Sequence, residues 1–253
     1  MKKSDTLNVT LRSQVLTRDK RTREVWKVVT RKAKFKPGET ALLLCDVWDK
    51  HTQRGAEARL GAMVPRMNRL VRHLRRKGVL IIHSPSDVID RYKDTPARKN
   101  VLAAPPVEPK EIPHDDPALP WDKDVSTTTD TIEPKWKGPG YPWTRENPGI
   151  EIRDEDAISA NGREVYSLLA ARGVKHLLIM GVHTNCCILH RTFGIKQMVK
   201  WGVDITLVRD LTDGIYSPSK PPYVSHDEGT QLVVGYIEKF WCPTVHSEEM
   251  LKQ

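Results

Sequence analysis

Short, continuous apolar runs alternate along this chain with longer segments in which apolar residues recur every three or four positions. The runs have the length and composition of buried parallel strands. They occupy residues 41–47, 79–83, 176–182 and 204–210, with a last one beginning near 243. The longer segments have the period of amphipathic helices. They occupy residues 60–74, 163–172, 185–201 and 227–241. This alternation predicts an α/β protein, a three-layer Rossmann-like fold with a mostly parallel six-stranded sheet.

Two regions depart from the alternation. Residues 7–35 alternate apolar and polar positions on either side of a polar turn, which predicts a β-hairpin within an N-terminal extension, 1–37, ahead of the main domain, 38–253. Residues 103–149 hold ten of the 18 prolines together with Trp121, Trp136 and Trp143. A long irregular stretch that is rich in tryptophan predicts an ordered lid or subunit-contact loop over the strand ends.

Composition narrows the class of protein. Hydrophobic residues make up 38% and charged residues 29% of the chain, and no apolar run approaches the ~20 residues that cross a bilayer. The N-terminus has no apolar stretch typical of a secretory signal. The net charge of +9 is scattered, without zinc-finger spacing or an aromatic-rich basic strand, so we expect no nucleic-acid partner. Four cysteines without a CxxC pair indicate reduced thiols and a cytoplasmic protein.

Two adjacent cysteines follow the apolar run that ends at Gly181. If Thr184 or Asn185 caps the next helix, Cys187 lies in its first turn, where free N–H groups and the helix dipole favour a thiolate. Cys186 lies about 100° further round the helix and is expected to face the sheet. A cysteine beside an apolar strand is otherwise a small buried filler.

Polar side chains follow three of the predicted strands. Because parallel strands place their carboxyl ends at one edge, these groups are expected to converge there. They are Asp46, Trp48, Asp49 and His51 after the first strand, His83 and Ser84 after the second, and His183, Thr184 and Cys187 after the fourth. A carboxylate beside a cysteine can take the thiol proton and return it to a leaving group.

These residues resemble the isochorismatase-like cysteine hydrolases over about residues 38–248. The nucleophile motif of that superfamily, Gly-x-x-Thr-x-x-Cys-Val, is matched by Gly181, Thr184, Cys187 and Ile188. The resemblance implies a Cys–Asp–Lys triad in which Cys187 attacks a carbonyl and Asp46 is the general base. It further implies an oxyanion hole from the N–H groups of His183 and Cys187, a cis Val182–His183 peptide, and a homodimer or homotetramer.

The lysine of the triad is missing. In the superfamily it ends the strand before the 163–172 helix, and a rough alignment places it near Glu151 to Arg153. Alternation puts Glu151 and Arg153 on one face. Arg153 would keep the positive charge but is a poor proton donor, whereas Glu151 would add a second carboxylate. Lys135 or Lys137, from the Pro/Trp-rich insertion formed by residues 103–149, could supply the cation instead.

The favoured function is hydrolysis of a C–N bond in a small amide or carbamoyl compound through a Cys187 thioester, without a cofactor. We expect Cys187, Asp46 and Glu151 to be catalytic and Trp48, His51, His83 and Arg153 to bind the substrate. Two alternatives remain open. One is a metal-assisted hydrolase that uses ligands among His51, His83, His183, Asp46 and Asp49. The other is a non-catalytic binding protein on the same fold.

Overall fold

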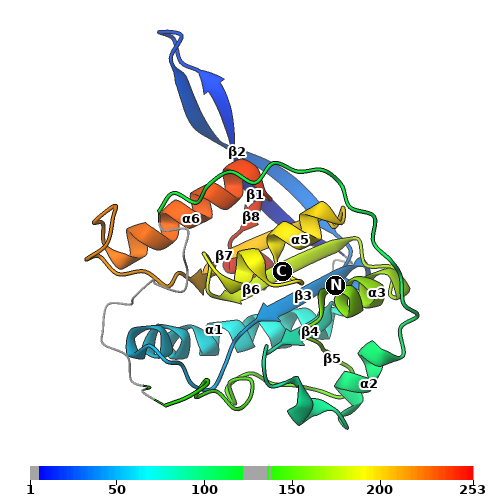
Figure 1. Cartoon of the computed structure of the whole chain (residues 1–253). Coiled ribbons are helices and arrows are strands. Elements are labelled where there is room, and N and C mark those ends of the chain that lie inside the picture. Colours follow the sequence, from blue (N-terminus) through cyan, green and yellow to red (C-terminus); the bar gives the residue numbers. More distant parts are fainter. Residues whose placement is uncertain (1–5, 122–135, 137, 253) are drawn as a thin grey trace.

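The computed structural model describes residues 6–121, 136 and 138–252. Its centre is one sheet with the strand order β2-β1-β8-β7-β6-β3-β4-β5 (Figure 1). Six of these strands run parallel, as the sequence predicts. They are β3 (Thr40–Cys45), β4 (Leu80–Ser84), β5 (Ala157–Ile158), β6 (His176–Val182), β7 (Ile205–Asp213) and β8 (Thr244–Val245).

The hairpin is part of the same sheet. Strands β1 (Leu7–Arg18) and β2 (Glu24–Phe35) pair antiparallel over their whole length, and β1 joins β8 where Arg12 faces Thr244. The sheet therefore has eight strands rather than the expected six, because the extension adds two antiparallel strands at one edge.

Helices cover both faces of the sheet and enclose two hydrophobic cores. On one face lie α1 (Arg54–Lys77) and α7 (Ser247–Leu251), which pack against Leu42, Leu44 and Leu178. The other face carries α3 (Gly162–Ala171), α4 (Cys187–His190), α5 (Ile195–Lys200) and α6 (His226–Phe240). The remaining helices are α2 (Pro96–Leu102) and the 3-10 turns η1 (Pro37–Glu39) and η2 (Ile89–Tyr92). This is the predicted three-layer arrangement, and no helix in the described ranges is both long and apolar enough to span a bilayer.

The predicted helix over residues 185–201 is wrong as a single element. It is two short helices, α4 and α5, separated by residues 191–194. The chain leaves α4 at Arg191, whose backbone is extended, and folds back so tightly that a Cβ on Gly194 would lie 2.8 Å from the Ile188 carbonyl oxygen. The apolar periodicity spans the break because Phe193 is fully buried there.

The described parts of the insertion are anchored to the body. Residues 143–147 run beside the loop after β3, where the Asn147 N–H donates to the Val47 carbonyl at 2.7 Å and Trp48 forms an antiparallel bridge with Glu146. Before the undescribed stretch, Trp121 is buried and its indole N–H donates to the Gly229 carbonyl at 3.1 Å. These contacts hold the insertion beside the loop after β3 and beside α6.

Candidate active site

The adjacent strands β3 and β6 bring Asp46 and the segment that contains Gly181 and Cys187 together. In the parallel register Cys45 faces Gly181 on one side and Ser84 of β4 on the other, so the residues after each strand meet at one edge. Gly181 has φ 122°, and a Cβ there would lie 2.0 Å from the Cys45 carbonyl oxygen. Only glycine therefore lets β6 pass this close to β3 before the chain turns to the cysteines.

Asp46 follows β3 and is fully buried, in the left-handed backbone region at φ 51°. Its Oδ1 accepts the Ser86 N–H at 2.9 Å and its Oδ2 accepts the Arg191 Nε–H at 2.9 Å. Burial raises the pKa of Asp46, although Arg191 and hydrogen bonds from the Cys187 thiol and Ser86 act in the opposite direction. A carboxylate with a raised pKa is a better proton acceptor than an exposed one.

Cys187 is the first residue of α4 and is buried. Its Sγ lies 3.9 Å from the Cys186 Sγ, to which the thiol can donate. This hydrogen bond, burial and the Asp46 carboxylate all raise the pKa of Cys187. The expected helix-dipole activation is small because α4 has only four residues. Cys187 is thus a thiol at rest, beside a carboxylate that can take its proton.

Arg191 supplies the positive charge beside Asp46 and Cys187, and it was not among the site residues expected from the sequence. It lies four residues after Cys187, one helical turn away, and its guanidinium reaches Asp46 and, at 3.5 Å, Asp87. About a third of its side chain is exposed. Burial disfavours the charged guanidinium, but Asp46 and the sulfur of Cys187 outweigh this and raise the pKa of Arg191. The i, i+4 spacing of Cys187 and Arg191 was the available signal.

The expected location of the missing lysine was wrong. The strand before α3 is β5, which ends at Ile158 rather than near residue 153. It is followed by Ser159, whose hydroxyl donates to Glu164 and whose N–H donates to the His83 carbonyl. Lys135 and Lys137 lie outside the described residues.

Three backbone N–H groups between His183 and Ile188 have no protein acceptor within the described ranges, those of His183, Asn185 and Cys187. Their neighbours are paired, since the N–H groups of Cys186 and Ile188 both donate to the His183 carbonyl, at 2.9 and 3.1 Å. The Val182–His183 peptide is cis, which confirms that expectation.

A chain of hydrogen bonds orients two histidines beside the site. The Gln53 N–H donates to His51 Nδ1 at 3.0 Å, His51 Nε2 lies 3.0 Å from His183 Nε2, and His183 Nδ1 lies 3.3 Å from the Asp213 carbonyl. One consistent assignment has both rings neutral, with His51 Nε2–H donating to His183. Burial and the proximity of His51 lower the pKa of His183 to about 3, so this ring stays neutral at physiological pH.

Aromatic side chains from the insertion stack over this region. Trp48 is buried, its indole N–H donates to the Ser86 carbonyl, and its ring stacks on Trp143 at a centroid distance of 4.1 Å. The Tyr141 ring also stacks on Trp143, at a centroid distance of 4.3 Å, and the His51 ring lies 5.8 Å from the Trp143 ring. Trp143 and Tyr141 were not among the expected site residues. They show that the insertion packs beside His51 and Trp48.

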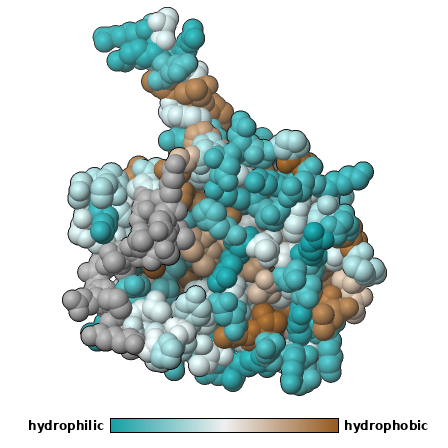
Figure 2. All heavy atoms as spheres, viewed as in Figure 1, coloured by the Kyte–Doolittle hydropathy of each residue, from teal (hydrophilic) through white to brown (hydrophobic). Residues whose placement is uncertain are grey.

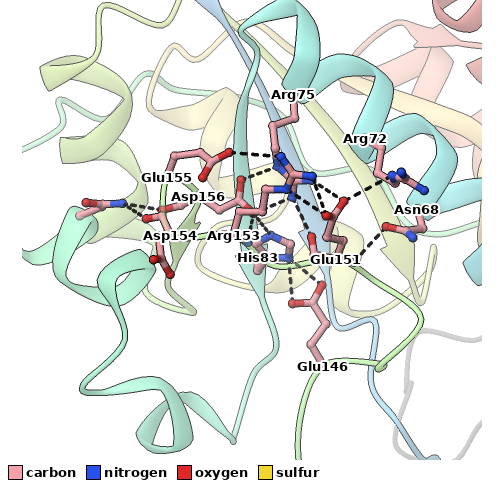
Figure 3. Close-up of polar contacts among 11 residues, drawn as sticks. Asn68, Arg72, Arg75, His83, Glu146, Glu151, Arg153, Asp154, Glu155 and Asp156 are labelled. Carbon is pink, nitrogen blue, oxygen red and sulfur yellow. Dashed lines mark hydrogen bonds and ion pairs between the residues drawn. The ribbon is translucent and has the colours of Figure 1, made fainter.

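Three expected site residues lie elsewhere. His83, Glu151 and Arg153 belong to a separate ionic cluster, called here the His83 network, with Arg75, Glu146 and Asp156 (Figure 3). The Glu151 carboxylate is bound by Arg72, Arg75 and Arg153 rather than turned toward Cys187. Glu151 and Arg153 do not share the face of a strand as predicted, because residues 151–153 form no strand and α1 supplies the arginines that bind Glu151.

His83 is fully buried between two carboxylates and cannot contact a substrate. Its Nδ1 lies 2.9 Å from Glu146 and its Nε2 lies 3.1 Å from Asp156. Burial disfavours the imidazolium, but the two carboxylates outweigh burial and raise the pKa of His83 to about 9. The expected role of His83 in substrate binding is therefore wrong.

The expected metal ligands are distributed over different partners. Asp49 accepts hydrogen bonds from Thr144 and Arg145, Asp46 is held by Arg191, and His83 lies in its own network. Within the described part of the chain, no three histidine, cysteine or acidic side chains are arranged to hold a metal ion.

Comparison with known proteins yields no matching family model and no matching curated protein. Solved structures do match. A cysteine hydrolase from Pseudomonas syringae pv. phaseolicola 1448A is 16% identical with a TM-score of 0.53, over 86% of this chain and 93% of that one. An isochorismatase from Pseudomonas putida KT2440 is 12% identical with a TM-score of 0.52, over 85% and 91%. The chain therefore has the isochorismatase-like fold, as the sequence resemblance implies.

Proposed function

We propose that this chain is a cysteine hydrolase that cleaves a C–N bond of a small amide or carbamoyl compound. The observation that carries the proposal is the buried Asp46 carboxylate, which is held by Arg191 and lies close enough to the Cys187 thiol for each group to shift the pKa of the other. A buried thiol that only filled space would need no ionised partner. The likeness in fold to a cysteine hydrolase supports the same reaction class.

In the first half of the reaction, Asp46 takes the proton of Cys187 as the sulfur attacks the carbonyl carbon of the substrate. The C=O electron pair moves onto oxygen, and the N–H groups of His183 and Cys187 stabilise this oxyanion. When the tetrahedral intermediate collapses, the C–N bond breaks and the leaving nitrogen takes the proton from Asp46. The products of this half are an amine or ammonia and a Cys187 thioester.

In the second half, water attacks the thioester and gives its proton to Asp46. A second tetrahedral intermediate collapses, the C–S bond breaks, and the proton returns to Cys187. The acid product leaves and the thiol is restored. Every proton passes through Asp46, because Arg191 stays charged and cannot act as an acid.

Arg191 has a positioning role in this scheme. It is the only cation placed by the described structure directly on Asp46, and it opposes the effect of burial on the pKa of that carboxyl. Its Nε–H donates to one carboxylate oxygen, Oδ2, at 2.9 Å and so fixes the orientation of the Asp46 side chain. In this chain Arg191 would supply, beside Asp46, the positive charge that the resemblance assigns to the lysine of the superfamily.

The direct test is turnover of a panel of small primary amides and N-carbamoyl compounds, with ammonia release as the readout. Mass spectrometry of the protein during turnover should detect an acyl adduct on the peptide that contains Cys187. Cys187→Ala should abolish both signals, and Cys186→Ala is the matched control.

Two outcomes would contradict the proposal. Undiminished turnover by Cys187→Ala, lost on chelation, would favour the metal-assisted hydrolase. Failure of Cys187 to form an adduct with any panel compound, in a protein that binds one of them, would favour the non-catalytic binding protein.

A further inference from the structure

The hairpin β1–β2 projects from the body as an arm (Figure 1). Contacts with α6 fix its base: Arg12 and Gln14 bind the Glu238 carboxylate at 2.6 and 3.0 Å, and the Trp26 ring meets the Phe240 ring edge-on at 5.4 Å. Beyond this base, no hydrogen bond or ring contact joins residues 15–25 to the described part of the body. The outer half of the arm is therefore available to a partner.

The arm carries most of the net positive charge of the protein. Residues 7–35 contain nine lysines and arginines and two acidic residues, which gives +7 of the total +9. Two of the cations form ion pairs, Arg12 with Glu238 and Arg23 with Asp19. The others are exposed and have no acidic partner within the described ranges. They are Arg18, Lys20, Arg21, Lys27, Arg31, Lys32 and Lys34.

These cations surround the arm instead of lining one side. Lys27 and Arg31 pair with Val15 and Leu11 and share the face of the core residues, whereas Lys32 and Lys34 pair with Thr10 and Asn8 on the opposite face. Lys20 and Arg21 lie in the turn at the tip. A flat anionic surface, such as a membrane, would meet only one of these faces. A groove between two chains of phosphates would meet both.

The apolar side chains of the arm fit the same partner. Val15, Leu16, Val25, Trp26 and Val28 are exposed. Figure 2 shows a hydrophobic band on the arm below a hydrophilic tip. The major groove of B-form DNA is about 12 Å wide and admits a two-stranded β-ribbon, where apolar side chains can contact base edges. Strands of 12 residues, about 40 Å long, are sufficient to enter it.

We propose that the β1–β2 arm binds double-stranded DNA, lying in the major groove with its unpaired lysines and arginines on the phosphates. Along the sequence these charges look scattered, which led to the expectation of no nucleic-acid partner. The fold separates them from the acidic residues of the body and presents them on one projecting element.

The test is fluorescence anisotropy of the full chain with a fluorescein-labelled, mixed-sequence DNA duplex of about 24 base pairs. Binding should be measurable at low salt and should weaken with a slope of log K against log[salt] between about −3 and −6, because up to seven phosphates are neutralised. The arm variant Lys20→Gln/Arg21→Gln/Lys27→Gln should bind at least tenfold more weakly and with a shallower slope, by about 3.

The matched control removes three exposed, unpaired cations from the body, Lys93→Gln/Lys110→Gln/Arg172→Gln. It has the same net charge as the arm variant and should bind nearly as tightly as the unmodified chain. Thermal unfolding of both variants shows that each is folded. Equal weakening by the two triple variants would overturn the proposal, since binding would then follow net charge alone. Absence of duplex binding at low salt, with or without binding to phosphatidylserine vesicles, would also overturn it.

Discussion

Two buried aspartates lie beside β3 and β5, the strands on either side of β4, and their pKa values shift in opposite directions. Asp46, after β3, is bound by one guanidinium and one backbone N–H and faces a thiol, and burial raises its pKa. Asp156, before β5, is bound by Arg75, His83 and the Arg153 N–H, and these contacts outweigh burial and lower its pKa. Both side chains are about 1% exposed or less, so burial alone does not distinguish them.

The difference lies in how completely each carboxylate is satisfied. Asp156 has three donors, two of them cationic, and retains little capacity to accept another proton. Asp46 has fewer donors and a sulfur within reach, so it can accept and return one. The comparison suggests that the His83 network stabilises the fold, whereas the group of Cys187, Asp46 and Arg191, called here the Cys187 group, performs chemistry. Five predictions test that division.

The largest effect is expected for Asp46→Asn. An amide cannot take the thiol proton, so the turnover number should fall by about 10²–10⁴-fold. Asp156→Asn is the matched control, with an unchanged turnover number per folded molecule but a lower melting temperature. A similar loss of turnover in both variants would contradict the division of roles.

Arg75→Gln should be the most destabilising change in the His83 network. The Arg75 side chain is 7% exposed and binds both Asp156 and Glu151, and its removal leaves the buried Asp156 carboxylate with His83 as its one cationic partner among the described residues. A loss of about 3 kcal/mol in the free energy of unfolding is expected from urea denaturation. Arg72→Gln, which removes an exposed pairing with the same Glu151, should cost less than about 1 kcal/mol. Equal losses of unfolding free energy in the two variants would show that burial does not strengthen the ion pairs of Arg75.

The stability of the protein should depend on pH through His83. Its pKa is raised from 6.5 to about 9, so the folded state binds the proton more tightly than the unfolded state. This contribution is fully present below pH 6.5, decreases between pH 6.5 and 9, and is lost above 9. It amounts to about 3 kcal/mol. Urea denaturation across this range should show the decrease in the unmodified chain and a flatter profile in His83→Gln. A flat profile in both would contradict a charged His83.

Replacing Arg191 should change the pH profile of turnover. Without the guanidinium, burial is opposed only by the hydrogen bonds of Ser86 and Cys187. The pKa of Asp46 therefore rises further, and the acid limb of the profile moves to higher pH. For Arg191→Gln we expect a loss of roughly 10- to 100-fold at neutral pH, as for removal of a charge-assisted hydrogen bond. Arg191→Lys should recover part of the activity and return the acid limb toward lower pH. A loss without any shift of the limb would indicate a merely structural role.

The smallest effect is expected for Cys186→Ala. Cys186 only accepts a hydrogen bond from Cys187, so its removal should lower turnover by less than about threefold, within the range of a weak interaction. Its hydrogen bond is also one cause of the raised pKa of Cys187, so thiol alkylation by iodoacetamide should become faster at a given pH. Loss of turnover as severe as that of Cys187→Ala would make Cys186 a candidate nucleophile.

The sequence by itself predicted the layers of the fold and half of the candidate site. Strands β3, β4, β6 and β7 are continuous apolar runs because both of their faces are covered. Gly181 and the residues after it could be placed beside Asp46 because parallel strands end at the same edge. These features depend on local periodicity and on a rule of topology, both of which are visible in one dimension.

Only the tertiary structure decided which charges meet. Arg191 reaches Asp46 because the chain breaks its helix at residues 191–194, where packing of Gly194 and burial of Phe193 override the helical period. Glu151 and His83 were assigned to the site by their place in the sequence, but arginines of α1 and the Glu146 carboxylate, which are remote in the chain, hold them in another cluster. Electrostatic partners are set by distances of a few ångströms between distant segments, and apolar patterning does not encode those distances.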